Sequence, residues 1–141
     1  MTARDRAAVG VETRVVGGDA ELVAPGQHLD GERLVQLEQV DVLEREGITI
    51  DDIGLFELNE PFAVQVLTWC DGVGVAPDDP RLNPYGGAIA CGHPLAATGV
   101  RLMAQLAYGF EQRSDVRYGL TALCVGLGMG AALLWENTRR G

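Results

Sequence analysis

His93 is the side chain in this sequence best suited to move a proton near neutral pH, and it lies in a glycine-rich turn. Gly92 precedes it and Pro94 follows it, between the apolar residues 88–90 and a helical pattern. Glycine allows a close backbone approach to a ligand, and proline suits the first turn of a helix. The spacing predicts an imidazole at a stiff corner, placed to act as a base or a hydrogen-bond donor. For this segment alone, a structural histidine in a turn is the simpler interpretation.

Two other segments change that interpretation. Asn59 directly follows one apolar strand pattern, and Cys124 lies at the end of another, just before glycines. A thiol there would be reachable, and backbone N–H groups and a histidine would favour its thiolate. Sites in open α/β sheets gather at the carboxyl ends of strands, where Asn59, His93 and Cys124 are all expected. We therefore expect His93 and Cys124 to line one cleft, with Asn59 nearby.

These three segments resemble the sequence boxes of the thiolase family. They read Asn-Glu-Pro-Phe-Ala over residues 59–63, Gly-Gly-Ala-Ile-Ala-Cys-Gly-His-Pro over 86–94 and Cys-Val-Gly-Leu-Gly-Met-Gly over 124–130. They come in the family's order and at about its spacing, and the resemblance covers roughly residues 12–137. One short motif can match by chance, but three in order are specific. Because all three boxes belong to the carboxy-terminal half of a thiolase, the resemblance implies that the chain corresponds to that half.

The resemblance also implies a role for each site residue. His93 would raise the nucleophilicity of a cysteine and help to hold the thioester oxygen, and Asn59 would orient a water that completes this first oxyanion hole. Cys124 would be the acid/base that removes or returns the α-proton of acetyl-CoA. Gly126 would give a backbone N–H to a second oxyanion hole, and Gly92 would contribute to substrate binding.

The implied reaction is acyl transfer through a covalent acyl-cysteine. It runs either as thiolysis of a 3-ketoacyl-CoA or as the reverse Claisen condensation. Coenzyme A is a substrate in both directions, and we expect no metal and no further cofactor.

The chain departs from the family's pattern at several positions. The family's nucleophilic cysteine lies in the amino-terminal half in a Cys-x-Ser-Gly context, whereas Cys70 is followed by Asp-Gly and is expected to be a small buried residue. Pro61 replaces an alanine at a position that the first turn of a helix tolerates. Ala96 replaces a frequent glycine and adds only a methyl. Leu127 replaces another glycine and would be strained at a positive φ.

Two functions from different classes stay open. The chain is the carboxy-terminal half of an acyltransferase that needs an amino-terminal half carrying the nucleophile, or it is a non-catalytic binding or scaffold module in acyl-CoA metabolism. An upstream reading frame with a Cys-Ser-Gly segment would favour the first. The expected partners are acyl-CoA or CoA and either a second copy or a thiolase amino-terminal half, in a homo-oligomer or a hetero-oligomer.

Length and composition fit one domain with a sizeable core, because the chain has 141 residues and 47% of them are hydrophobic. A formal net charge of −9 argues against nonspecific nucleic-acid binding. The sequence has no apolar run long enough for a membrane span and no secretion signal at its start. Its three cysteines have no paired spacing, which argues against a zinc site or a disulfide framework and fits a reducing cytoplasm.

The hydrophobic patterns predict an α/β fold in the order β-α-β-α-β-α-β-β over residues 11–141, after a frayed amino terminus over 1–10. By resemblance this is a thiolase carboxy-terminal domain. The predicted strands are 11–16, 53–58, 88–90, 117–124 and 130–136, and the predicted helices are 32–46, 59–69 and 95–112. The order indicates a mixed sheet with helices on both faces, in which the last two strands add an antiparallel edge to a parallel sheet. Met103 and Phe110 are expected in the core.

Overall fold

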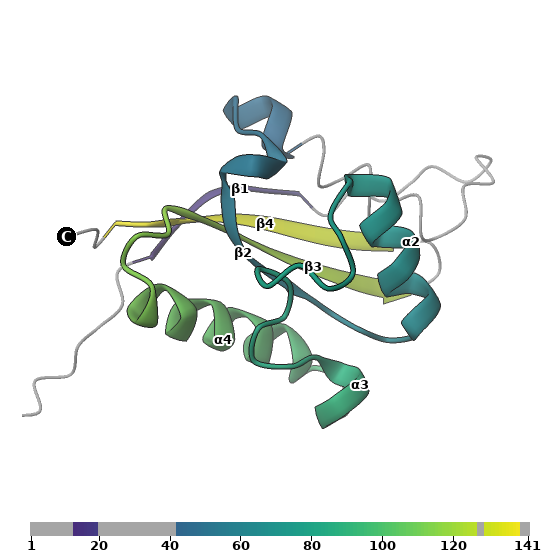
Figure 1. The fold of residues 1–141 in the computed structure, drawn as a ribbon. Helices are drawn as coiled ribbons and strands as arrows, with labels where there is room; N and C mark the ends of the chain where they lie inside the picture. Colours follow the sequence, from purple (N-terminus) through teal and green to yellow (C-terminus); the bar gives the residue numbers. More distant parts are fainter. Residues whose placement is uncertain (1–12, 20–41, 127–128, 139–141) are drawn as a thin grey trace, which may run out of the picture.

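The computed structural model describes residues 13–19, 42–126 and 129–138, which form a mixed sheet with helices packed against it (Figure 1). Its strands are β1 (Thr13–Asp19), β2 (Ile53–Leu58), β3 (Tyr118–Gly126) and β4 (Met129–Asn137). They lie in the order β1-β4-β3-β2. β2 and β3 run parallel, whereas β4 is antiparallel to both of its neighbours. The predicted α/β class with a mixed sheet is confirmed.

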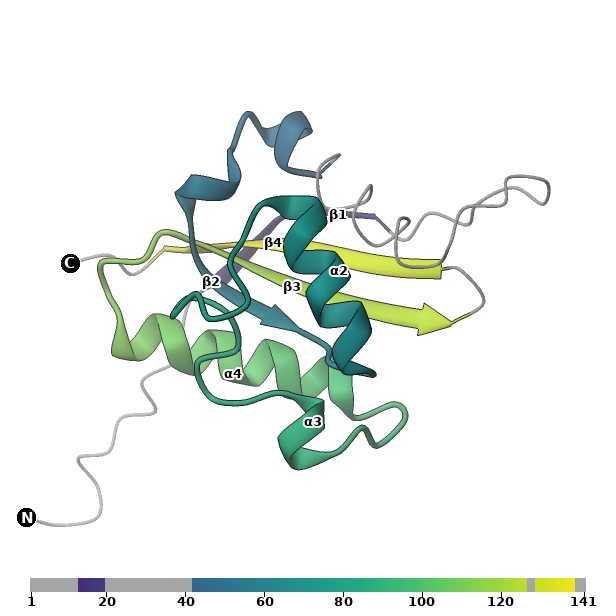
Figure 2. The same ribbon diagram turned by 45° about the vertical axis from the view of Figure 1, so that its right-hand side comes forward.

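Helices cover both faces of this sheet, as predicted (Figure 2). They are the 3₁₀ helix η1 (Ile50–Asp52), α2 (Ala63–Val73), the short α3 (Ala88–Cys91) and α4 (Thr98–Gln112), and residues 42–46 are also helical. Residues 42–46 and α2 pack on one face, and α4 packs on the other.

β2 lies between two cores and determines which side chains meet which helix. Phe56 and Leu58 belong to the core under α2, whereas Leu55 packs against Leu106 and Phe110 of α4. Because side chains alternate along a strand, Glu57 lies on the same face as Leu55 and is directed toward α4. The side chains on both faces of β2 are buried, since every residue of the strand except Gly54 is buried.

The predicted strand over residues 88–90 is wrong, because these residues form α3. The N–H groups of Ala90 and Cys91 both donate to the Gly87 carbonyl, and the N–H of Gly92 donates to the Ala88 carbonyl at 2.8 Å. Only Ala88 of the helix is buried, and Ile89 is 62% exposed. A short apolar run does not distinguish a strand from a helical turn by its periodicity.

The absence of that strand changes the sheet. The only parallel pair among the described strands is β2 with β3, so the sheet is not otherwise parallel as predicted. β4 is an interior strand, because β1 pairs with its far side and forms the edge. The final antiparallel hairpin of β3 and β4 is confirmed.

Three helix boundaries differ from the prediction. α2 begins at Ala63 and continues to Val73, where Gly74 ends it with a φ of 76°, so Cys70 lies inside the helix and does not close it. α4 begins at Thr98, not at residue 95. The rest of the predicted helix over 32–46 and the amino-terminal residues 1–10 lie outside the described residues.

The expected core residues are confirmed only in part. Phe110 is 2% exposed, but Met103 is 36% exposed and lies at the margin of its helix face. No helix of the described residues has the length and the apolar character that crossing a membrane requires.

Candidate active site

Asn59 and Cys124 lie at the carboxyl ends of the two parallel strands, as predicted. Leu58 pairs with Ala122, and the backbone N–H of Asn59 donates to the Ala122 carbonyl at 2.8 Å. Cys124 is two residues further along β3 and pairs with Gly130 of β4. The parallel register therefore brings the Asn59 backbone to the segment of β3 that carries the thiol.

The side chain of Asn59 is buried without a hydrogen-bond partner. The residue is 2% exposed, and neither its amide oxygen nor its amide nitrogen is paired. A buried unpaired polar group costs about 1–3 kcal/mol. Both atoms are thus free to bind a small polar group at the end of β2.

Cys124 is half-buried and packs on the α2 side of the sheet. The side-chain amide of Gln65, in the first turn of α2, donates from Nε2 to the cysteine Sγ at 3.8 Å. Gln65 is a neighbour that the sequence analysis missed. Only its place six residues after Asn59 in the first box could have pointed to it.

His93 follows α3 and does not follow a strand, so its predicted place at a strand end is wrong. Gly92 ends α3 with a φ of 89°, a conformation that favours glycine and turns the chain toward the exposed imidazole. The imidazole Nδ1 lies 2.6 Å from Oγ1 of the buried Thr98, at the start of α4. When the Thr98 hydroxyl donates to the Pro94 carbonyl, at 3.2 Å, Nδ1 must be the donor and Nε2 keeps a free lone pair.

Glu60 connects the end of β2 to the segment that leads to His93. Its carboxylate accepts from Asn83 Nδ2 at 2.7 Å and from the backbone N–H of Ile89 at 3.1 Å. Asn83 also accepts the Leu58 N–H on its side-chain oxygen at 2.7 Å. These bonds fix the start of α3 relative to β2, a role that the sequence analysis did not assign.

Glu57 is a buried carboxylate that the sequence analysis missed. It is 1% exposed and neither of its oxygens is hydrogen-bonded. Burial raises the pKa of Glu57 to about 7, and Arg101 opposes this rise while Glu60 adds to it. Arg101 lies on α4 and donates to the Gly86 carbonyl at 3.4 Å, so it spans from α4 to the turn before α3.

The other two thiols do not resemble nucleophiles. Cys70 is 2% exposed, which confirms the predicted buried residue, and burial raises the pKa of its thiol. Cys91 is exposed on α3, where its Sγ lies 3.1 Å from the Gly87 carbonyl. Within the described residues, no group of three or more His, Cys, Asp or Glu could hold a metal ion.

Two positions at which the sequence departs from the thiolase boxes are described, and one is not. Pro61 lies before α2 and outside its first turn. Ala96 was expected to add only a methyl, but its φ of 65° means that it also adds backbone strain. Leu127 lies outside the described residues.

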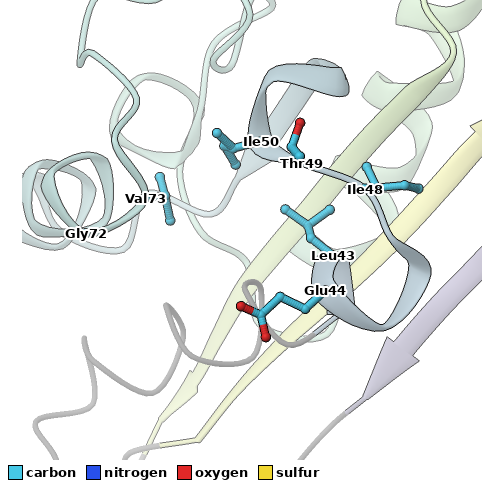
Figure 3. Close-up of a pocket in the computed structure, with 7 residues that line it drawn as sticks. All are labelled: Leu43, Glu44, Ile48, Thr49, Ile50, Gly72 and Val73. Carbon is cyan, nitrogen blue, oxygen red and sulfur yellow. The ribbon is translucent and has the colours of Figure 1, made fainter.

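A cavity of about 300 Å³ lies at the opposite end of β2 from Asn59 (Figure 3). Its walls come from the segment around residues 42–50 and from the end of α2. They consist of Leu43, Glu44, Ile48, Thr49, Ile50, Gly72 and Val73. A smaller cavity of about 90 Å³ lies between α4 and the strands β3 and β4. Neither cavity contains Asn59, His93 or Cys124 in its walls.

The chain belongs to the thiolase family, because the family described as "Thiolase, C-terminal domain" matches residues 36–137. Over 96 residues it is 47% identical to the 3-ketoacyl-CoA thiolase of Yersinia enterocolitica, covering 67% of this chain and 24% of that protein. Over 129 residues it is 39% identical to the beta-ketoadipyl-CoA thiolase of Acinetobacter baylyi, covering 92% of this chain and 28% of that protein. The chain therefore spans about a quarter of the length of these relatives.

A solved structure supports the same assignment at the level of the fold. The peroxisomal 3-ketoacyl-CoA thiolase of Saccharomyces cerevisiae matches with a TM-score of 0.73 and 32% identity, over 89% of this chain and 34% of that one. That protein is described as five layers, A-B-A-B-A, built from two core domains of identical topology. The α-β-α layers of this chain correspond in number to one such core domain.

Proposed function

We propose that this chain supplies the carboxy-terminal domain, over residues 11–141, of a thiolase-type acyltransferase. The enzyme would transfer an acyl group between a 3-ketoacyl-CoA or acetyl-CoA and CoA. An amino-terminal half with the nucleophilic cysteine would complete it, as part of a longer chain or as a second chain. We place the complex in the cytoplasm and expect it to be an oligomer.

The unpaired buried amide of Asn59 carries this proposal. At the carboxyl end of β2 it can hold a water. Nε2 of His93 would first take the proton of the nucleophilic cysteine, and the protonated Nε2 and this water would then donate to the thioester oxygen as negative charge develops on it. Fixed donors of this kind usually make the largest contribution to acyl-transfer catalysis. The Thr98 contact supports the role of His93, because it fixes the ring through Nδ1 and leaves Nε2 for the substrate.

Cys124 would perform the proton transfer on the second substrate. Its thiolate would take the α-proton of acetyl-CoA, and the resulting carbanion would attack the acyl-cysteine carbonyl. In thiolysis the same thiol would return the proton to the leaving acetyl group. The backbone N–H of Gly126, at the end of β3, would stabilise the negative oxygen of that substrate, and the turn at Gly92 would lie against the acyl group.

Reconstitution tests the proposal. The isolated chain should show no thiolysis of acetoacetyl-CoA above a blank, because it lacks the nucleophile. Mixed with the amino-terminal half of the Saccharomyces cerevisiae enzyme, or of an enzyme encoded upstream, it should turn over acetoacetyl-CoA. Asn59→Ala should then lower kcat by about 10²-fold, the usual effect of losing one oxyanion donor.

His28 is the other histidine of the sequence and serves as the matched control. His28→Ala should leave kcat unchanged, in contrast to His93→Ala. Cysteine-dependent turnover by the isolated chain would contradict the need for a second half. A stable complex of the two halves that binds CoA but has no turnover would support the non-catalytic binding module instead.

A further inference from the structure

We propose that Gln65 is a positioning residue for Cys124, and that its side-chain amide serves the thiol and the thiolate in turn. This inference rests on the acid/base role proposed for Cys124. It deepens that role by assigning the group that holds the sulfur while the cysteine gains and loses its proton.

The two side chains meet although 59 residues separate them in sequence. Gln65 lies in the first turn of α2, where its backbone N–H donates to the Phe62 carbonyl at 3.1 Å. The same helix is anchored further along by the buried residues Trp69 and Cys70. Cys124 is held by its pairing with Gly130 of β4. The contact of 3.8 Å between Nε2 and Sγ thus joins two side chains on fixed backbone elements.

The side-chain amide of Gln65 has a second polar atom that is not engaged in a hydrogen bond. Its Oε1 is buried and has no hydrogen-bond partner. A primary amide donates through its nitrogen and accepts through its oxygen. In the observed orientation the nitrogen donates to sulfur, which suits a thiolate. Half a turn about the last side-chain torsion, a soft two-fold rotation, would present the oxygen to an S–H group.

This pair of orientations explains the choice of glutamine for an acid/base cysteine. Such a residue spends part of each cycle as a thiol and part as a thiolate. An ionised glutamate could only accept and would repel the thiolate, a lysine could only donate, and a methionine of similar size cannot donate and accepts only weakly. Among these side chains, glutamine alone can pair with both forms of the sulfur.

Alkylation of the full 141-residue chain by iodoacetamide tests the proposal without any acyltransferase activity. The thiolate sulfur displaces iodide, so the rate reports how much thiolate is present and how well it is positioned. Tryptic cleavage after Arg81, Arg101 and Arg117 places Cys70, Cys91 and Cys124 in three different peptides, so mass spectrometry follows each rate separately. Exposed Cys91 is the internal reference, and buried Cys70 reports whether the fold is intact.

We expect Gln65→Met to slow alkylation of Cys124 at pH 7.5 by about 3- to 10-fold, since a hydrogen bond to a charged group is worth more than a neutral one. Gln65→Glu should slow it further, and Gln65→Lys should speed it. The rate–pH profile of Cys124 should move to higher pH in the first two variants and to lower pH in the third. Gln112→Met, at the exposed end of α4, should change nothing.

Wild-type rates and an unshifted profile for Cys124 in all three variants would overturn the proposal. If Gln65→Met exposes Cys70, the Lys variant decides, because faster Cys124 alkylation with Cys70 still protected cannot come from unfolding. A failed reconstitution would contradict the acyltransferase function and leave these alkylation rates as they are. Unchanged rates beside successful reconstitution would remove Gln65 alone.

Discussion

The carboxyl group of Glu60 occupies the space that a side chain at Gly87 would need. A Cβ atom built on Gly87 would lie 2.0 Å from Cδ of Glu60. The glycine therefore lets the carboxylate reach Asn83 on one side and the N–H of Ile89 on the other. The carboxylate of Glu60 thus joins the first sequence box to the second, although Glu60 and Gly86 are 26 residues apart.

Gly87→Ala should lower the free energy of unfolding by about 1–3 kcal/mol, the usual cost of overpacking. The glutamate side chain can move aside, but it then gives up both hydrogen bonds. Urea unfolding measures the effect. Gly99→Ala is the matched control, because a Cβ there meets nothing within 4 Å. In a Glu60→Ala background Gly87→Ala should cost much less, and an additive double mutant would disprove the coupling.

Ala96→Gly should stabilise the chain. Ala96 has a φ of 65°, and the left-handed conformation costs about 1–2 kcal/mol for a residue with a Cβ. Glycine removes that cost but loses about 0.5–1 kcal/mol through its freer unfolded state. The net gain should be about 0.5–1 kcal/mol, read from the denaturation midpoint. Ala104→Gly, inside α4, should have the opposite sign.

Glu57 should make stability fall as the pH rises. Its pKa is raised to about 7 in the folded chain from an ordinary value of 4.5. Folding therefore favours the protonated acid, so this stabilisation is complete below about pH 4.5 and is lost as the pH rises through about 7. Glu57→Gln stays neutral throughout. Relative to this variant, wild type should lose about 3 kcal/mol between pH 4.5 and pH 8. A constant difference between the two unfolding free energies across this range would refute the assignment.

Thr98→Val should release the imidazole of His93. The Nδ1 atom would lose its partner at 2.6 Å, and the ring would no longer be held in one orientation. The ¹⁵N shifts of the ring should move from a single dominant tautomer toward a mixture, whereas Thr98→Ser should retain the wild-type pattern. The chain has two histidines, so the His93 signals can be assigned by comparison with His28→Ala. Identical spectra for the Val variant would show that Thr98 does not position the ring.

The outer face of α4 should drive self-association of the isolated chain. Val100 is 62% exposed and Met103 lies beside it one turn along the helix. Exposed apolar patches of this kind mark interaction sites, and the amino-terminal half is the proposed cover. Sedimentation at micromolar concentration should show oligomers or aggregates that Val100→Lys with Met103→Lys reduces. Val64→Lys on α2 is the control, and a monomeric wild type would contradict the prediction.

The sequence predicted what depends on local patterns and short motifs. The bounds of β2 were recovered in full, because Ile53–Leu58 is apolar and is followed by a polar box. Residues 88–90 were assigned wrongly, since a short apolar run fits one turn of helix as well as a strand. The positive φ of Ala96 and the contacts of Glu57 and Glu60 could not be predicted. They depend on which elements meet across the sheet.

Residues 81–83 run along the outer edge of β2 and hydrogen-bond to it. The Phe56 N–H donates to the Arg81 carbonyl and the Phe56 carbonyl accepts from the Asn83 N–H, both at 2.8 Å. The Asn83 side chain takes the Leu58 N–H, and Arg113 donates to the Gly54 carbonyl. These backbone N–H and C=O groups of β2 are therefore already paired, and a further strand cannot add to this edge of the sheet through them. At this edge, growth of larger assemblies must therefore proceed by stacking layers, helix against helix, and not by adding a strand beside β2.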